Sequence, residues 1–137
     1  MAATHSSHLL TTVLIVDDDA RTRAGYRDVL LSAGFDVIAA YNGLHALKLM
    51  EQGELPDIIV LGLGPPHQGG LDLYDELLAH AEKSLIPVVV LSGIDLSPQQ
   101  QARFPFLLQR PVATQALVFA VDNALRRAFG GGRDVGA

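Results

Sequence analysis

Residues 56–66, PDIIVLGLGPP, decide the fold of this chain. Residues 58–61 form an unbroken run of β-branched and aliphatic side chains, with a proline before it and a Gly/Pro-rich segment after it. Such a short apolar run predicts a strand buried on both faces, at the centre of a parallel sheet. In open parallel α/β sheets, ligands bind just beyond the carboxyl ends of the strands. The residue at that end is Gly62, which has no side chain to act as a nucleophile, a base or a metal ligand.

The composition is that of one ordinary domain and excludes several classes of function. The chain has 137 residues, of which 49% are hydrophobic and 18% are charged, so a large core is expected. A formal net charge of −5 argues against nucleic-acid binding, and the absence of cysteine excludes disulfides and thiolate sites. The apolar runs are shorter than the roughly 20 residues that span a bilayer, and no signal peptide is evident. We therefore expect a cytoplasmic protein with no nucleic-acid partner and no membrane partner.

The hydrophobic pattern predicts five strands that alternate with five helices. The strands are expected at residues 12–16, 36–40, 58–61, 88–91 and 106–109. The helices are expected at residues 20–32, 44–52, 71–83, a short one that begins after Ser97, and 112–129. Leu44, Leu47 and Met50 are expected to face the core from the second helix, as is Phe129 from the last. The alternation predicts an α/β fold with a parallel sheet and helices on both faces.

The domain boundaries follow from the same pattern. Residues 1–10 are expected to form a flexible leader, residues 11–129 the domain, and residues 130–137 a flexible tail or the stub of a linker.

Polar side chains follow three of the predicted strands. Asp17 and Asp18 follow the first strand, Ser92 follows the fourth, and Arg110 follows the fifth. Because the carboxyl ends of parallel strands meet at one edge of a sheet, these side chains are expected to gather around Gly62.

Four segments of this chain resemble, in order and spacing, the receiver domain of bacterial two-component response regulators. They are VLIVDDDA, PDIIVLGLGPPHQGGLDL, PVVVLSG and FLLQRPV, and the similarity runs from about Val13 to Phe129. The resemblance implies a flavodoxin-like sheet of order 2-1-3-4-5 and a role in phosphorelay signal transduction. In that family an acidic pair holds Mg²⁺, an Asp accepts a phosphoryl group from a histidine kinase, and a Ser or Thr and a Lys contact that group.

Carried over residue by residue, the resemblance assigns a role to each strand-end residue. Asp17 and Asp18 correspond to the acidic pair, and Ser92 corresponds to the hydroxyl switch residue. Gly62 falls at the phosphoacceptor position and Arg110 at the lysine. Leu107, with Phe106 just before it, lies where the family often has an aromatic switch residue.

Two of these positions depart from the family in their chemistry. An acyl phosphate needs a carboxylate nucleophile, which Gly62 lacks. With only Asp17 and Asp18 remaining, Mg²⁺ is expected to bind weakly, and no cofactor is required. We hypothesise that Arg110 fills the vacated pocket, pairs with Asp17 or Asp18, and holds the domain in one state without phosphate. The segment from Ser92 to Arg110 is also shorter than in the family by about one helical turn.

The function expected from these features is that of a pseudo-receiver, a non-enzymatic signalling module that acts by protein–protein contact. A histidine kinase or another signalling protein would bind the face formed by the short fourth helix, the fifth strand and the last helix, and a homodimer is left open. Only a Gly-rich tail follows Phe129, so the chain is expected to be a single-domain regulator or a fragment cut before an effector.

Two alternatives remain open at this point. Phosphorylation could occur elsewhere in the same fold, for instance on His67 in the loop after Gly62. From a different class, the Asp-x-Asp of Asp17 and Asp19 resembles small haloacid-dehalogenase phosphohydrolases. In such an enzyme Asp17 would be the nucleophile and Asp19 the acid/base, with Arg110 in place of the lysine.

Overall fold

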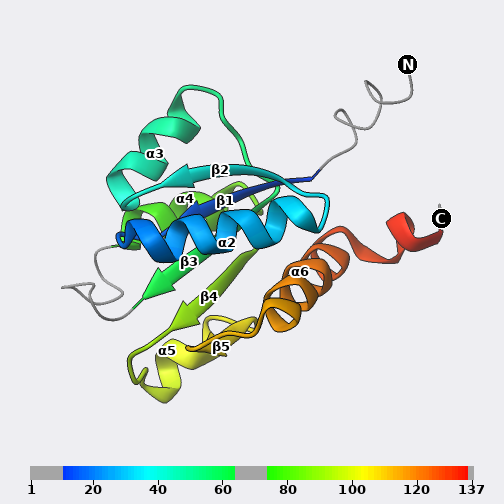
Figure 1. Ribbon diagram of the computed structural model, residues 1–137. Coiled ribbons are helices and arrows are strands. Elements are labelled where there is room, and N and C mark those ends of the chain that lie inside the picture. Colours follow the sequence, from blue (N-terminus) through cyan, green and yellow to red (C-terminus); the bar gives the residue numbers. More distant parts are fainter. Residues whose placement is uncertain (1–10, 64–73, 136–137) are drawn as a thin grey trace.

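The strands form one parallel sheet in the order β2-β1-β3-β4-β5, which confirms the predicted fold class and strand order (Figure 1). The computed structural model describes residues 11–63 and 74–135, with side chains up to residue 129. The strands are β1 (Thr12–Val16), β2 (Asp36–Ala40), β3 (Ile58–Leu63), β4 (Val88–Ser92) and β5 (Leu107–Gln109). The helices are α2 (Ala20–Ser32), α3 (Gly43–Glu51), α4 (Asp75–Lys83), α5 (Pro98–Ala102) and α6 (Thr114–Val135).

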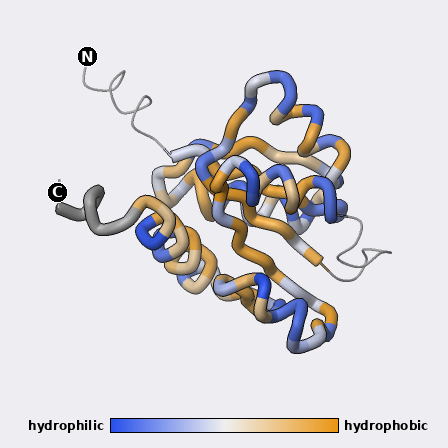
Figure 2. Tube along the Cα trace, turned by 180° about the vertical axis from the view of Figure 1, so that it is seen from behind, coloured by the Kyte–Doolittle hydropathy of each residue, from blue (hydrophilic) through white to orange (hydrophobic). Residues whose placement is uncertain are grey.

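Helices cover both faces of this sheet. Helices α2 and α6 pack on one face and α3 and α4 on the other, and each pair encloses its own apolar cluster. All six residues of β3 are buried, as expected of a central strand whose side chains meet helices on both sides. Figure 2 shows the central strands as nearly continuous hydrophobic segments, whereas hydrophilic and hydrophobic residues alternate along the helices.

Local signals in the sequence set most helix starts. The side chains of Asp19 and Asn42 accept hydrogen bonds from backbone N–H groups in the first turns of α2 and α3. Ser97 and Gln100 form a reciprocal capping box at the start of α5, where Pro98 occupies the first helical position. Helix α5 nevertheless has only five residues, because the chain must reach the buried Phe104 and enter β5.

Two predicted inward positions are wrong. Leu44 is 64% exposed and Phe129 is 41% exposed. In α3 Met50 is buried and Leu47 packs against the core as predicted, but Gly43 and Ala46 are buried where Leu44 was expected. Both sets of residues have helical spacing, and the sequence pattern alone did not separate them.

The last helix continues beyond its predicted end. The backbone of α6 is helical to Val135, whereas the Gly-rich segment after Phe129 predicted an earlier stop. Glycine lowers helix propensity by about 1 kcal/mol per residue but does not forbid helical backbone angles. The proposed domain boundaries at residues 10 and 129 stay predictions, and residues 71–73 of the predicted third helix lie outside the described residues.

Among residues 11–63 and 74–135, none of the helices combines the length and the apolar character that crossing a lipid bilayer requires.

Candidate functional site

The carboxyl ends of the strands bring the predicted residues to one edge of the sheet. Gly62 is in register with Leu91, and the next residue, Leu63, is in register with Ser92. Asp17 follows directly after Val16, the residue of β1 in register with Leu61. The predicted gathering of strand-end residues around Gly62 therefore includes Asp17, Ser92 and Arg110.

The centre of the site is an ion pair between Arg110 and Asp17. A terminal nitrogen of Arg110, Nη2, donates to Asp17 Oδ2, and the Asp17 side chain is only 2% exposed. The other carboxylate oxygen, Oδ1, accepts the backbone N–H of Asp19 at 2.9 Å. Arg23 reaches over from α2 and donates to the carbonyl oxygen of Asp17 at 2.7 Å. The predicted pairing of Arg110 is present, and both oxygens of the Asp17 carboxylate have a partner.

The guanidinium of Arg110 occupies the space beside Gly62. A Cβ atom added to Gly62 would collide with Arg110 Nη2 and Asp17 Oδ2, and it would lie 2.9 Å from Asp17 Cγ. Real Cβ atoms do not approach other atoms this closely. Any side chain at position 62 would therefore require the ion pair to move.

Two tyrosines interact with the charges of this site. The Cζ atom of Arg110 lies 6.0 Å from the centre of the Tyr26 ring, within the range of a cation–π contact. Burial raises the pKa of the Tyr26 hydroxyl, and the positive charge of Arg110 offsets part of that rise. Burial also raises the pKa of Tyr74 to about 12, with further contributions from the negative charges of Asp18 and Asp17.

Sequence reasoning missed Arg23, Tyr26 and Tyr74 as parts of the site. Arg23 and Tyr26 are three residues apart on α2, so they share a helix face. That spacing, directly after the acidic strand end, was the available signal.

Ser92 is fully buried, and its hydroxyl forms a local turn. The Ser92 Oγ atom donates to the carbonyl oxygen of Ile94 at 2.7 Å and accepts the N–H of Ile94 at 3.2 Å. The backbone carbonyl of Ser92 accepts the N–H of Arg110 at 2.9 Å, which ties the ends of β4 and β5 together.

The two acids after Asp17 differ in their surroundings. Asp18 is exposed. Asp19 caps α2, with Oδ2 accepting from the Thr22 N–H at 2.9 Å and from the Thr22 hydroxyl at 2.5 Å. These hydrogen bonds, led by that of the hydroxyl, lower the pKa of the Asp19 carboxyl. The side chain of Asp19 is therefore engaged in starting a helix.

The described residues do not fit a Mg²⁺ site. Both carboxylate oxygens of Asp17 are engaged, and one of them binds a guanidinium whose charge repels a cation. Among residues 11–63 and 74–135 there is no group of three or more His, Asp or Glu side chains that could hold a metal ion.

The remaining predicted positions lie on opposite faces of the sheet. Leu107 is half-buried and packs against the cluster beneath α3 and α4, whereas Phe106 packs on the side of α6. The Cζ atom of Arg127 lies 5.9 Å from the centre of the Phe106 ring. His67 lies outside the described residues.

Comparisons with known proteins agree with this architecture. The parallel sheet of order 2-1-3-4-5 with helices on both faces is the fold of CheY-like receivers, as comparison with solved structures shows. The chain superposes on a response regulator receiver domain protein from Clostridium thermocellum with a TM-score of 0.71 and 23% identity, over 86% of this chain and 96% of that one. A CheY-like receiver domain protein from Methanospirillum hungatei gives a TM-score of 0.72 and 21% identity, over 87% and 96% of the two chains. At these identities the similarity shows the fold alone.

The family model of the response regulator receiver domain matches residues 13–104, and the chain belongs to this family. Response regulator MprA of Mycobacterium ulcerans is 29% identical over 119 residues, which cover 84% of this chain and 50% of that protein. A protein-glutamate methylesterase/protein-glutamine glutaminase of Rhodospirillum rubrum is 37% identical over 86 residues, which cover 62% of this chain but 22% of that protein. The chain thus spans between about a fifth and a half of the length of these relatives.

Proposed function

We propose that this receiver domain works in two-component signalling as a pseudo-receiver, by contact with a protein partner and without accepting a phosphoryl group. The observation that carries the proposal is the position of Arg110. Its guanidinium fills the space beside Gly62, where the side chain of an acceptor residue would begin.

The chemistry of the site supports this reading. In the correspondence to the family, Gly62 stands at the phosphoacceptor position, and glycine offers no carboxylate to form an acyl phosphate. Arg110 stands at the lysine position, and its planar fork and fixed charge suit a standing pair with a carboxylate. The pair neutralises Asp17 within the protein, so the domain requires no metal ion to balance that charge.

The hydroxyl switch is also engaged in the resting structure. Both hydrogen bonds of the Ser92 hydroxyl go to Ile94. Recruiting this hydroxyl to a new ligand would break a buried turn, at a net cost of about 1 kcal/mol per hydrogen bond. We infer that the site is held in a single state by its own side chains.

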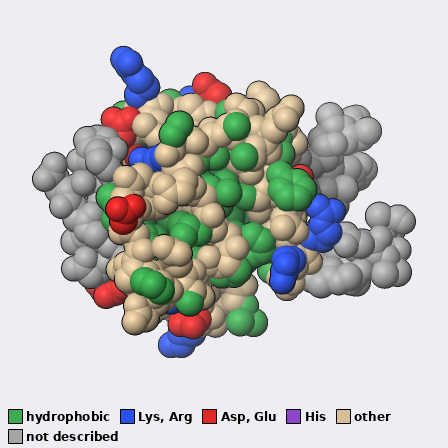
Figure 3. Space-filling view, turned by 90° about the horizontal axis from the view of Figure 1, so that it is seen from below, with side chains coloured by type: hydrophobic (Ala, Val, Ile, Leu, Met, Phe, Trp, Pro, Cys, Tyr) green, Lys and Arg blue, Asp and Glu red, His purple; other side chains and the backbone are tan. Residues whose placement is uncertain are grey.

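The partner surface that we propose is the face formed by α5, β5 and α6. Figure 3 looks onto this side of the molecule and shows apolar side chains over its middle, with charged side chains mainly near its edge. Phe119 on α6 is 66% exposed, although a phenylalanine in a monomer is usually buried. An apolar centre with a polar rim is the usual anatomy of a protein–protein interface.

The test is exposure of the purified chain to acetyl phosphate and Mg²⁺, followed by intact-mass measurement. We expect no gain of a phosphoryl group. The matched variant Gly62→Asp/Arg110→Lys restores an acceptor and removes the guanidinium that blocks it, and it is expected to gain one. A phosphoryl group on the unmodified chain would contradict the proposal, and fragmentation would locate it at His67 or elsewhere.

The phosphohydrolase alternative is not favoured. Its nucleophile, Asp17, is buried in an ion pair, and its acid/base, Asp19, caps a helix. We propose that the domain is not an enzyme. Mg²⁺-dependent hydrolysis of an aryl phosphate that disappears in Asp17→Asn would reverse this conclusion.

A further inference from the structure

Helices α2, α3 and α4 end in the same kind of left-handed turn, but α4 has a leucine where the other two have glycine. After α2 and α3 the chain turns through Gly34 and Gly53, with φ of 98° and 96°. After α4 the corresponding residue is Leu85, with φ of 60°. The same two backbone hydrogen bonds close each turn. After α2 they are Phe35 N–H to Leu30 O and Gly34 N–H to Leu31 O, and after α3 they are Glu54 N–H to Leu49 O and Gly53 N–H to Met50 O. After α4 they are Ile86 N–H to Ala81 O and Leu85 N–H to Glu82 O.

Leucine is an unfavourable residue at this position for an isolated domain. A residue with a Cβ atom adopts left-handed backbone angles at higher energy than glycine, which is why such turns usually contain glycine. Leu85 is also 83% exposed, so its apolar side chain gains nothing from burial within the chain. Strained residues of this kind tend to be retained where they serve a function.

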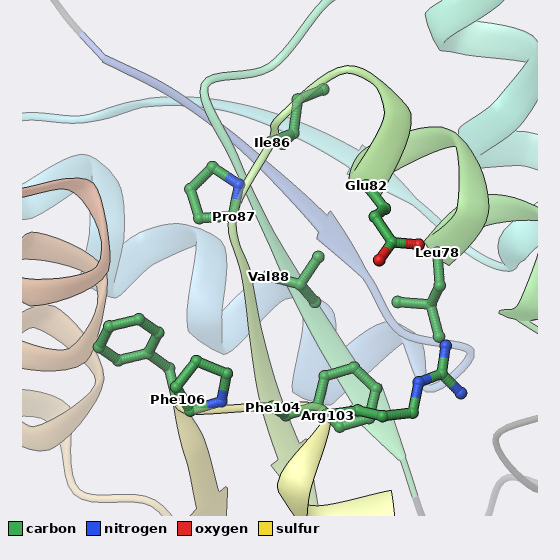
Figure 4. A pocket seen from close by; sticks show the side chains of 9 residues that line it. Leu78, Glu82, Ile86, Pro87, Val88, Arg103, Phe104 and Phe106 are labelled. Carbon is green, nitrogen blue, oxygen red and sulfur yellow. The ribbon is translucent and has the colours of Figure 1, made fainter. Parts of the chain in front are cut away.

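A groove lies directly beside Leu85. It has a volume of about 340 Å³ and runs between α4, the start of β4 and the segment that leads into β5. Figure 4 shows Val88 between Ile86 and Pro87 at one end and Phe104 and Phe106 at the other. The groove lies next to the five-residue helix α5, and its volume exceeds what a single leucine side chain requires.

The groove carries one charge of each sign. Glu82 comes from α4 and Arg103 from the turn after α5, and both residues are exposed. Within the part of the chain that the structure describes, neither takes part in an ion pair. The Cζ atom of Arg103 instead lies 5.4 Å from the centre of the Phe104 ring.

Such a surface is complementary to itself. It places the exposed Leu85 beside a groove lined mainly by apolar side chains, with an acid and a base on that groove that form no ion pair with any described residue. In a two-fold symmetric interface the same patch serves both subunits. Leu85 of one copy can then face the groove of the other, and Glu82 of one copy can face Arg103 of the other. A second copy of this chain therefore offers the groove an apolar side chain and charges of the complementary sign.

We propose that two copies of this chain associate through this surface. Leu85 of each copy enters the groove of the other, and Glu82 of each copy faces Arg103 of the other. None of these residues belongs to the Asp17–Arg110 site, so the proposed dimer and the proposed absence of phosphorylation are tested separately.

The test is sedimentation velocity of the full chain over a range of concentrations. We expect self-association, and we expect Leu85→Gly to weaken it by about tenfold or more, because each dimer loses two buried leucines. Glycine suits the turn, so this variant keeps its fold, which its circular dichroism and thermal midpoint will show. Leu55→Gly is the matched control, because Leu55 is 62% exposed and does not line the groove, and it is expected to associate like the wild type.

Charge exchange tests the orientation of the two copies. Glu82→Arg alone and Arg103→Glu alone are each expected to weaken association by placing like charges together, whereas the double variant restores it. A monomer at every concentration would overturn the proposed dimer and leave the groove to a different protein. A dimer that Leu85→Gly leaves unchanged would overturn it as well.

Discussion

The two ends of β4 contrast a closed site with an open one. At the carboxyl end Arg110 is 15% exposed and bound to a buried carboxylate, and Ser92 is hydrogen-bonded within its own turn. At the amino end Arg103 and Glu82 are exposed beside an apolar groove. In this family the carboxyl end would hold the reactive chemistry. Here Arg110 and Asp17 pair with each other and the Ser92 hydroxyl bonds to Ile94, while Arg110 Nε is buried without a hydrogen-bond partner among the described residues. The groove with exposed charges on its walls lies at the other end.

The largest effect is expected from removing the closed site's cation. Arg110→Met leaves Asp17 buried without its partner and is expected to lower the free energy of unfolding by about 3–5 kcal/mol. Arg103→Met is the matched control, because Arg103 is exposed and forms no ion pair with a described residue, and its loss is expected to change stability by no more than about 0.5 kcal/mol. Urea denaturation measures the free energy of unfolding of both variants. Equal losses would contradict the view that the carboxyl end of β4 is a closed site and the amino end an open one.

Adding one methyl group to Gly62 tests whether the site is filled. Gly62→Ala places a Cβ atom on the Asp17–Arg110 pair and is expected to destabilise by about 1–3 kcal/mol. Gly25→Ala, on α2 with nothing within 4 Å of the added atom, is expected to stabilise by about 0.5–1 kcal/mol. The cost of Gly62→Ala is expected to shrink but not to vanish in the Arg110→Met background, because one of the two colliding side chains is shortened while Asp17 stays in place. If Gly62→Ala left the free energy of unfolding unchanged, the Asp17–Arg110 pair would be easy to displace.

The stability of the chain at alkaline pH is expected to depend on the buried Tyr74. Tyr74 has a pKa raised to about 12 in the folded chain, against an ordinary value of 10.0. Its neutral form is therefore favoured by folding. This contribution to stability is fully present below about pH 10 and is lost as the pH rises toward 12. Tyr74→Phe is expected to flatten the fall in stability over that range, measured by denaturation at each pH. An unchanged slope would show that Tyr74 ionises as freely in the folded chain as in the unfolded one.

The smallest change in stability is expected at Leu85, beside the groove at the amino end of β4. Leu85→Gly is expected to raise the stability of the monomer by about 0.5–1 kcal/mol, since glycine adopts the left-handed turn without strain. Leu55→Gly replaces an exposed leucine that has no left-handed backbone and is not expected to stabilise. The comparison is made by thermal denaturation at a concentration low enough to keep both variants monomeric.

The sequence predicted the strands well because their apolar runs are short and clearly bounded. The run at 58–61 identified the buried centre of the sheet, and the strand-end residues Asp17, Ser92 and Arg110 followed from the rule that parallel strands end at one edge. A pair of Arg110 with Asp17 or Asp18 was predictable from the charges expected at this edge, whereas the choice of Asp17 was not.

Other features depend on side-chain direction, which spacing alone does not give. Arg23 and Tyr26 join the site because α2 turns one face toward the end of β1. In α3 the prediction was right for Leu47 and Met50 and wrong for Leu44, because Gly43 and Ala46 also have helical spacing from Met50. The turn at Leu85 carried no signal at all, since such turns are recognised in sequence by glycine.

We propose that the ion pair leaves no room for a phosphoryl group beside Gly62. The most direct test of this claim is NMR titration of the chain with beryllofluoride and Mg²⁺, with the Gly62→Asp/Arg110→Lys variant as the positive control. We predict that the amide signals of Gly62, Asp17 and Ser92 stay in place in the wild type and shift in the control. Saturable shifts at these amides in the wild type would contradict the claim.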